Sequence, residues 1–346
     1  MIYFAIGFFL FSMAFFEIYV SNRIYSKSLL LLCFLMFLLV AALRVNVGPD
    51  WGSYYEFYTN KEEAARLEFG YELLNNFSSS IRLHYNFFIF LINILSLRFI
   101  YLFIINNSKF YFLPALLFFS DLFLYFNLSG IRQAIAISIT CYSITYVINR
   151  DFYKFLFAII LASSFHSTAL IFLSVYFIPV KPIDFKNLII AFSLCIFILY
   201  FAEPISDLIT LYGLKDTNYY INNQQASVGT DAYYVGAFRR AVIIFFLVVF
   251  RSQYFTKNEN YLFANVYLVG FAIYMLTYNI SPDIGVRLSS YFLIFEMLIV
   301  GRILTQVKSI NKRIFILSIF TTISFYKIFG YINDESYIYN SIINIF

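Results

Sequence analysis

Five arginines stand near the ends of long hydrophobic runs, and arginine is the side chain best suited to holding a phosphate group. Its guanidinium stays charged and donates two parallel hydrogen bonds from a planar fork. An arginine in lipid costs several kcal/mol, so a set at one depth predicts a bound anion or a water-filled cavity. The alternative is that each one snorkels to the membrane surface. The five are Arg44, Arg132, Arg239, Arg240 and Arg287.

Arg132 is the most specific of the five because it stands at the start of a predicted helix. Unpaired backbone amides and the helix dipole favour an anion there, and the neighbouring Gln133 adds a donor. Arg287 is less specific, since Asp283 lies four residues before it and the two could simply pair. We predict a diphosphate site formed by Arg132, Gln133, Arg287 and Arg44, with the other two arginines in reserve.

Two residues are candidates for a general base that activates a hydroxyl group. His166 can take or give a proton near neutral pH. Asp50 follows Gly48 and Pro49, which break a helix, so its carboxylate is expected on a turn at the membrane surface. The residues alone do not decide between the two bases.

Tyrosines in two polar loops could stack against sugar rings, with Tyr54 and Tyr219 as the candidates. The alternative is an interfacial aromatic belt.

The three cysteines lie in apolar runs without metal-ligand spacing, so we expect no metal. HExxH, GxSxG, Walker and dinucleotide-binding motifs are absent from the sequence, which leaves hydrolase, ATPase and dehydrogenase functions unsupported. We expect no cofactor and no nucleic acid partner.

The composition is that of an integral membrane protein, with 62% hydrophobic residues, 12% charged residues and a mean hydropathy of +0.78. Long apolar runs predict an all-α, polytopic helical bundle rather than a barrel. We expect one membrane domain over residues 1–346 with about eleven hydrophobic segments, each able to form a span of ~20 residues. They are residues 2–20, 28–43, 85–105, 110–127, 130–148, 153–178, 187–202, 235–250, 261–278, 284–300 and 313–330.

The distribution of basic residues between these segments predicts the orientation. Most connections rich in Lys and Arg are placed in the cytoplasm, which leaves both termini and the acidic loops 44–84 and 203–234 outside. The first loop suggests an amphipathic helix from Glu62 to Leu74. Run 153–178 has basic flanks at both ends, so we predict a hairpin of two short helices with His166 near its outer tip. The alternative is one tilted helix.

Four stretches, in order along the chain, resemble motifs of the EpsG-type polysaccharide polymerases, a family related to the Wzy O-antigen polymerases. They begin at Arg44 (Arg-Val-Asn-Val-Gly-Pro-Asp-Trp-Gly-Ser-Tyr), Glu68 (Glu-Phe-Gly-Tyr), Gly130 (Gly-Ile-Arg-Gln) and Leu161 (Leu-Ala-Ser-Ser-Phe-His). The resemblance is clearest over residues 40–175. Phe69 and Ser167 stand where many family members have proline.

The resemblance implies a bacterial inner-membrane glycosyltransferase of the GT-C-like type that uses neither a nucleotide sugar nor a metal. Such an enzyme joins repeat units of O-antigen or exopolysaccharide carried on undecaprenyl diphosphate, at the periplasmic face. Membrane lipids and a chain-length regulator are the other expected partners. A flippase or secondary transporter, an O-antigen ligase in lipopolysaccharide biosynthesis and a non-catalytic scaffold are the alternatives. Four charges within the runs keep transport open: Glu17, Arg98, Asp121 and Glu296.

Overall fold

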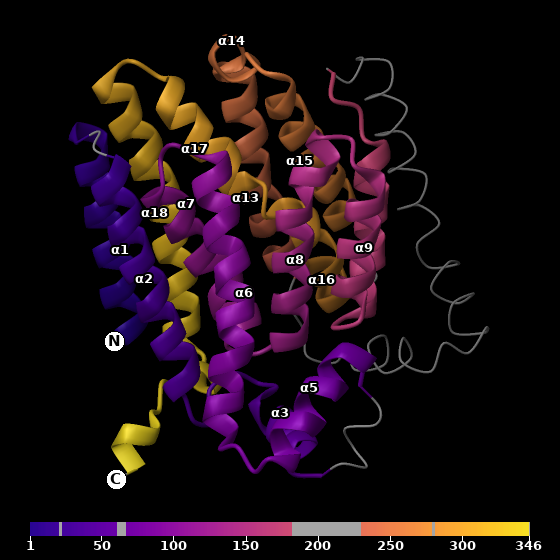
Figure 1. The fold of residues 1–346 in the computed structure, drawn as a ribbon. Helices are drawn as coiled ribbons and strands as arrows, with labels where there is room; N and C mark the ends of the chain where they lie inside the picture. Colours follow the sequence, from indigo (N-terminus) through magenta and orange to yellow (C-terminus); the bar gives the residue numbers. More distant parts are fainter. Residues whose placement is uncertain (21–22, 61–66, 182–229, 279–280, 346) are drawn as a thin grey trace. The chain divides into compact units, whose positions relative to one another are not determined.

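The computed structural model describes residues 1–20, 23–60, 67–181, 230–278 and 281–345, and its regular elements there are all helical (Figure 1). Seven helices within these ranges are long and apolar enough to cross a membrane. The predicted polytopic helical bundle is therefore confirmed, whereas the expected count of about eleven segments is not. The predicted segment 187–202 lies outside the described residues. The seven are Ile2–Tyr19, Tyr25–Leu43, Tyr85–Asn107, Ile131–Ile148, Asn258–Thr277, Pro282–Gln306 and Ile310–Asn333.

The described chain divides into two compact units. The first, unit 1, comprises residues 1–176 and 300–346, and the second, unit 2, comprises residues 177–299. Unit 1 contains α1 (Ile2–Tyr19), α2 (Arg23–Leu43), α3 (Trp51–Thr59), α5 (Phe69–Ser80), α6 (Tyr85–Asn107), α7 (Phe112–Phe118), η1 (Phe119–Asn127), α8 (Ile131–Ile148), α9 (Phe152–Ser163), most of η2 (Ser167–Phe177), the end of α17 (Glu296–Gln306), α18 (Ile310–Asn333), η3 (Glu335–Tyr337) and η4 (Ile342–Ile345).

Unit 1 is built on two groups of packed helices. In one, α6 lies between α2 and α8, and α8 also packs on α9. In the other, α1 packs on α7 and α18. Most side chains of α8, α7 and η1 are buried. Membrane helices that are buried on most sides, as here, are placed to carry polar groups at their ends without exposing them to lipid.

Element η1 is a π-helix of nine residues that continues α7 directly. Such wide turns are rare and are often found at functional sites. This one ends at Asn127, whose amide donates to Asn93 Oδ1 at 2.9 Å on α6. The chain then passes through Ser129 and Gly130 into α8, so the π-helix sets the position of the residues that precede Arg132.

Both termini and the loop after α2 lie at the same end of unit 1 (Figure 1). The Tyr3 hydroxyl donates to the Tyr337 carbonyl at 3.0 Å. The Val45 amide donates to the Asn340 carbonyl at 2.9 Å, which seals the C-terminal segment against the loop. This agrees with the predicted shared side for the termini and loop 44–84. That this side is the outside of the cell stays a prediction.

The predicted hairpin of run 153–178 is confirmed. The two short helices α9 and η2 are joined by a turn at Ser164–His166. Their far ends meet, because Phe152 and Tyr176 pack edge to face with ring centroids 5.0 Å apart. The Tyr176 hydroxyl also donates to the Arg150 carbonyl at 3.1 Å. His166 therefore stands at the tip, as expected from the polar residues that interrupt the run.

Of the amphipathic helix predicted from Glu62 to Leu74, the structure describes only residues 67–74. Residues 61–66 are outside the described ranges, and α5 begins only at Phe69. Glu68 precedes it in an extended conformation, with φ −65° and ψ 141°. The Glu68 side chain contacts His166 and Arg132. The spacing of apolar residues after Glu62 could not indicate these contacts.

Unit 2 contains α13 (Thr230–Val249), α14 (Arg251–Tyr254), α15 (Asn258–Thr277), α16 (Pro282–Leu293) and the start of α17. Helices α15 and α16 pack closely, since a Cβ on Gly270 would come within 2.5 Å of Phe292. The loop 203–234, with Tyr219, lies almost wholly outside the described residues.

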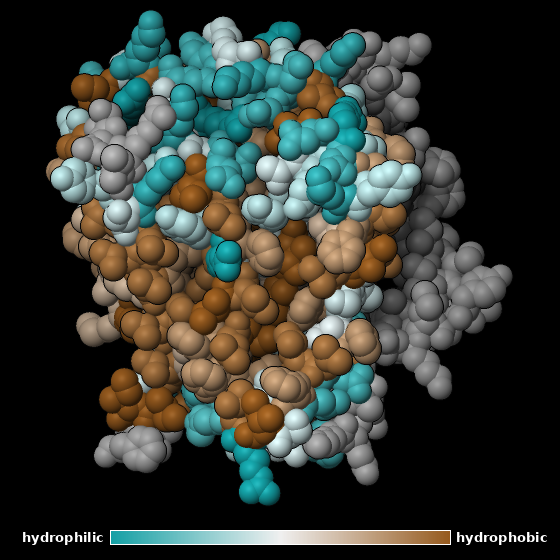
Figure 2. All heavy atoms as spheres, in the orientation of Figure 1, coloured by the Kyte–Doolittle hydropathy of each residue, from teal (hydrophilic) through white to brown (hydrophobic). Residues whose placement is uncertain are grey.

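Large apolar side chains cover the outward faces of α1, α2 and α6. Phe8 is 57% exposed, Leu32 is 54% exposed and Phe87 is 48% exposed. Figure 2 shows a broad band of hydrophobic side chains bounded by hydrophilic ones on this face. An apolar surface of this kind suits lipid and not water, so the chain is a multi-pass membrane protein.

Candidate active site

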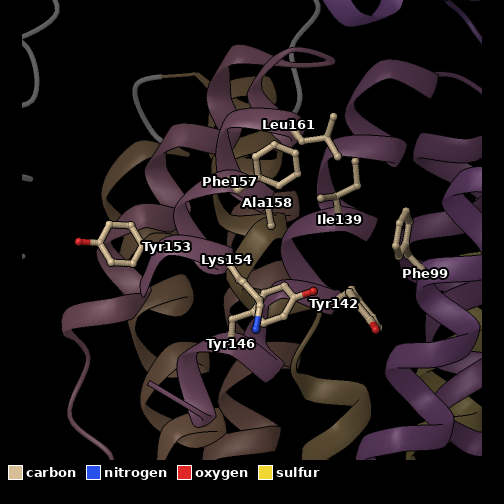
Figure 3. Close-up of a pocket in the computed structure, with 9 residues that line it drawn as sticks. All are labelled: Phe99, Ile139, Tyr142, Tyr146, Tyr153, Lys154, Phe157, Ala158 and Leu161. Atoms are coloured by element: carbon tan, nitrogen blue, oxygen red, sulfur yellow. The ribbon is translucent and has the colours of Figure 1, made fainter. Parts of the chain in front are cut away.

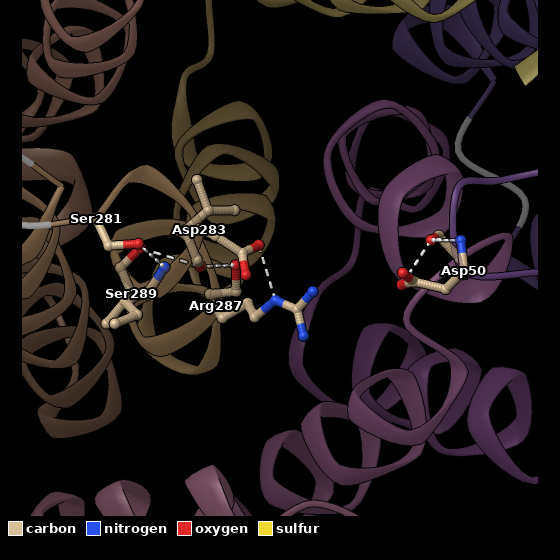
Figure 4. Close-up of polar contacts among 9 residues, drawn as sticks. Asp50, Ser281, Asp283, Arg287 and Ser289 are labelled. Carbon is tan, nitrogen blue, oxygen red and sulfur yellow. Dashed lines mark hydrogen bonds and ion pairs between the residues drawn. The ribbon is translucent and has the colours of Figure 1, made fainter. Parts of the chain in front are cut away.

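The loop after α2 places Asp50 against the start of α8. Gly48 has φ +90°, and a Cβ at this position would stand 2.3 Å from the Leu128 carbonyl oxygen. Only glycine allows this approach. The Ser129 hydroxyl then donates to Asp50 Oδ2 at 2.8 Å, and the Asp50 amide donates to Ser129 Oγ at 3.3 Å (Figure 4). The carboxylate is thus held beside the residue that precedes the N-cap of α8.

A second glycine brings Glu68 to the tip of the hairpin. The Gly70 amide donates to the Ser164 carbonyl at 2.7 Å. A Cβ on Gly70 would lie 2.9 Å from that carbonyl oxygen, which would force the two segments apart. The start of α5 and the α9–η2 turn therefore touch through bare backbone, and Glu68, two residues earlier, reaches His166.

The Glu68 carboxylate contacts three groups, two at the hairpin tip and one at the start of α8. Oε1 contacts His166 Nδ1 at 2.9 Å and accepts the Ser167 amide at 3.3 Å. Oε2 accepts a hydrogen bond from a terminal nitrogen of Arg132. The Arg132 side chain is 23% exposed, that of Glu68 is 20% exposed and that of His166 is 14% exposed. The cluster is shielded but still accessible.

Tyr54 on α3 completes the surroundings of Arg132. The Arg132 Nε donates to the Tyr54 hydroxyl at 3.3 Å, and the guanidinium carbon lies 5.8 Å from the ring centroid. The Tyr54 ring packs edge to face on buried Tyr71 of α5 at 5.7 Å. Helices α3 and α5 therefore fix the arginine from two directions, so its guanidinium is oriented before any ligand arrives.

Charge and burial oppose each other at Glu68. Burial by itself would raise the pKa of this carboxyl, because the charged form loses water. The hydrogen bond with His166 and the charge of Arg132 outweigh it and lower the pKa from 4.5 to about 2. Glu68 is therefore ionised at neutral pH, and a carboxylate with so low a pKa is a weak proton acceptor.

An anionic carboxylate at Nδ1 fixes how the imidazole of His166 can work. When Nδ1–H donates to Glu68, Nε2 is the nitrogen that accepts a proton, and the carboxylate stabilises the imidazolium that results. Arg132 has five N–H donors, of which Glu68 and Tyr54 take two. The arrangement offers a base and an anion-binding cation on either side of one carboxylate.

The EpsG family model matches residues 27–344, nearly the whole chain. The chain belongs to the EpsG family. This is a polysaccharide polymerase-type family, so the chain has a polysaccharide polymerase or glycosyltransferase-like role in a membrane. No curated protein and no solved structure matches the chain. The resemblance stated from the four motifs is thereby confirmed, and the GT-C-like fold stays a prediction.

Among the residues predicted for the site, the structure of this EpsG-family chain brings Arg132 and His166 together through Glu68, and Tyr54 contacts Arg132. Asp50 lies one turn before Tyr54 at the start of α3, and its carboxylate contacts Ser129. The two candidate bases thus flank the start of α8 with separate partners. Their assignment as bases stays a prediction.

Two predicted phosphate ligands are placed inside the protein. Arg44 is 2% exposed and donates to the Ala41 carbonyl of the preceding helix, α2. Gln133 is also 2% exposed, because it points from α8 into the packed interior. The sequence positions at a helix end suggested solvent contact for both, but the folded chain buries both side chains. We leave both out of the proposed phosphate site.

The other three predicted arginines belong to unit 2, so their convergence with Arg132 stays a prediction. Arg287 Nε donates to Asp283 Oδ1 at 2.8 Å, which is the pairing considered from their spacing (Figure 4). Arg240 lies 3.6 Å above the Tyr274 ring and is 8% exposed. Arg239 lies 3.8 Å from Glu296.

Sequence reasoning missed Glu68 and Ser129 as site residues. Glu68 was visible as the acid that opens the second family motif, and Ser129 as the hydroxyl three residues before Arg132. The available sequence signal for Glu68 was its position two residues before Gly70 in a polar loop. Its partners, 64 and 98 residues further along the chain, could not be read from spacing.

An apolar cavity of about 410 Å³ lies in unit 1 between α6, α8 and α9 (Figure 3). Aromatic residues dominate its lining, including Phe99, Tyr142 and Phe157, and Leu161 stands at one end. The same two helices α8 and α9 carry Arg132 and lead to His166. At 1.5 Å per residue, the cavity begins on the order of 10 Å along α8 from Arg132.

Proposed function

We propose that this protein polymerises repeat units of O-antigen or exopolysaccharide at the periplasmic face of the bacterial inner membrane. It transfers the growing glycan from undecaprenyl diphosphate onto a lipid-linked repeat unit. Support comes from the family, from the membrane-spanning helices and from a site that pairs a proton acceptor with a cation. No nucleotide sugar and no metal takes part in this proposal.

The observation that carries the proposal is the bridge from His166 through Glu68 to Arg132. His166 Nε2 takes the proton of the acceptor hydroxyl, and the acceptor oxygen attacks the anomeric carbon of the donor sugar. The bond from that carbon to the diphosphate oxygen breaks, and undecaprenyl diphosphate leaves with the bonding electrons. Arg132 stabilises the negative charge that develops on the diphosphate, where a preorganised cation is most effective. The imidazolium then releases its proton to water.

Asp50 is the second candidate for the base. Its contact with Ser129 beside the start of α8 supports a role near the same substrate. A variant pair separates the two assignments. Asp50→Asn is expected to retain most activity if His166 is the base, whereas His166→Gln loses it. The reverse result would transfer the role to Asp50.

The aromatic cavity between α6, α8 and α9 supports a lipid-linked substrate. A polyprenyl chain attached to a diphosphate at Arg132 would extend along α8 and α9, toward Leu161 and Ile139 of the cavity lining (Figure 3). A largely apolar lining favours such a chain over a polar sugar. A soluble sugar substrate would have no use for this surface.

Transport is the alternative function from another class, and the partners of the charges within the runs weaken it. Glu17 accepts the amides of Tyr111 and Phe112 at 2.9–3.0 Å, which caps the start of α7. Asp121 forms an ion pair with Lys327. Charges that move ions or substrates are expected along an open pathway, whereas these two serve contacts between packed helices.

The proposal is tested by deleting the gene and separating the surface glycan on a gel. A polymerase deletion leaves single repeat units on the lipid core and removes longer chains. Loss of single units as well would indicate a ligase or a flippase and overturn the proposal. Complementation with Arg132→Ala is expected to restore no ladder at normal protein levels, while Arg251→Ala, an exposed arginine on α14, restores it.

A further inference from the structure

A second cavity, of about 240 Å³, lies at the end of unit 1 where α1 finishes and α18 begins. Its lining combines the cations Lys109 and Arg313 with the hydroxyls of Ser26 and Thr305. One acid, Glu17, also contributes. These residues come from five separate segments of the chain, so the cavity exists only in the folded protein.

The acid in the cavity is already engaged. Both oxygens of Glu17 accept the Tyr111 amide, at 3.0 and 2.9 Å, and one of them also accepts the Phe112 amide at 3.0 Å. Arg313 uses Nε to donate to the Val307 carbonyl at 2.6 Å, which orients its guanidinium. Its two terminal nitrogens carry the other four donors of the side chain.

The surrounding connections are strongly basic. Residues 20–27, 107–111 and 304–313 contain no acidic residue. The second connection is also bonded to α17, which leads into the third, since Arg302 Nε donates to the Asn107 carbonyl at 2.7 Å. Lys109 and Arg313 therefore sit in a positive region, where a phosphate is attracted electrostatically. The basic residues of the three connections are Arg23, Lys27, Lys109, Lys308, Lys312 and Arg313.

Two of the helices that line the basic cavity also carry exposed apolar side chains at this end of unit 1. Phe16 is 57% exposed and Tyr19 is 55% exposed on the last turns of α1, and Phe315 is 58% exposed on the first turns of α18. A ligand that satisfies both surfaces has a phosphate head and apolar chains. Free phosphate would fit the cavity but would leave this apolar border unused.

We propose that the cavity lined by Lys109 and Arg313 binds the phosphate of an anionic membrane phospholipid whose chains lie against α1 and α18. The site lies at the other end of α1 from the contacts with the C-terminal segment, so it is distinct from the Glu68 cluster. It does not depend on the proposed polymerase activity. It ties three chain connections to the lipid surface and stabilises unit 1 there.

The test measures thermal unfolding of the full-length protein in nanodiscs of phosphatidylcholine, with and without phosphatidylglycerol. Phosphatidylglycerol is expected to raise the midpoint, because a ligand that binds only the folded state stabilises it. Lys109→Gln and Arg313→Gln are each expected to weaken the lipid affinity about fivefold and reduce this rise. Lys257→Gln, an exposed lysine of unit 2 outside the lining, is the control and keeps the rise.

Three results would overturn the inference. The first is equal unfolding midpoints in the two lipid mixtures. The second is an equal response in the wild type and both cavity variants, which would mean that the lipid acts elsewhere. The third is full stabilisation by inorganic phosphate in phosphatidylcholine nanodiscs, which would assign the site to a free anion. Since Arg313→Gln also removes the bond to Val307, Lys109→Gln is the decisive variant.

Discussion

Replacement of Glu68 by glutamine tests the site most sharply, because it keeps the size of the side chain and removes its charge. The variant loses the ionic part of the contacts with His166 and Arg132. A neutral amide also no longer fixes the imidazole through a charged acceptor. We expect both the stability of unit 1 and the rate of polymerisation to fall.

The size of the stability loss follows from the pKa of Glu68. A fall from 4.5 to about 2 means that the folded state favours the carboxylate over the acid. Each tenfold change in the acid constant is worth about 1.4 kcal/mol, which gives ~3 kcal/mol. Solvent screens part of this, because the side chain is 20% exposed, and about 2 kcal/mol is the expected cost.

The stabilisation by Glu68 is expected to decrease as the pH falls. The folded-state pKa of Glu68 lies below its ordinary value, so its contribution is fully present above about pH 4.5 and is lost as the pH falls toward 2. Denaturant unfolding in detergent is therefore expected to separate wild type from Glu68→Gln at pH 7. The difference should shrink between pH 4.5 and 2. Glu72→Gln, four residues later on α5, is the control and should leave stability within about 0.5 kcal/mol.

Two results would refute this reasoning. If Glu68→Gln were as stable as wild type at pH 7, the bridge would carry no net free energy. A stability difference that persisted unchanged to pH 2 would show that the loss comes from shape or packing and not from charge.

Three further perturbations have outcomes that the structure sets. Arg132→Lys keeps the charge but loses the planar fork, so chain ladders on a gel should fall roughly tenfold in intensity. Gly48→Ala forces a Cβ toward the Leu128 carbonyl at φ +90°, and thermal unfolding should reveal a loss of roughly 2 kcal/mol or more. Lys327→Met removes the ammonium that pairs with Asp121 and should lower the free energy of unfolding by about 3 kcal/mol. Most of this loss should be recovered when Asp121 is also replaced by Leu. No recovery in the double variant would contradict the pairing.

The sequence predicts the class of fold because hydrophobic length is a local property. The hairpin around His166 was also predictable, since basic flanks at both ends of one run cannot be reached by a single crossing. Arg132 could be identified because helix starts are marked by local signals such as Gly130.

The contacts that make a site from these residues could not be predicted. Glu68 reaches His166 only because Gly70 allows two backbones to touch, and that approach depends on the tertiary packing of α5 against the hairpin. For Arg44, the sequence suggested exposure where the structure shows burial. Its position at a helix end suggested the surface, yet the C-terminal segment returns and covers it, with an isolated bridge to Ser341.

Purified protein in nanodiscs, supplied with lipid-linked repeat units and no other protein, tests the central claim most directly. We predict that wild type forms a ladder of longer lipid-linked glycans and releases undecaprenyl diphosphate, and that His166→Gln and Arg132→Ala each form none while remaining folded. Failure of the folded wild-type protein to extend the glycan, or a normal ladder from either variant, would contradict the account.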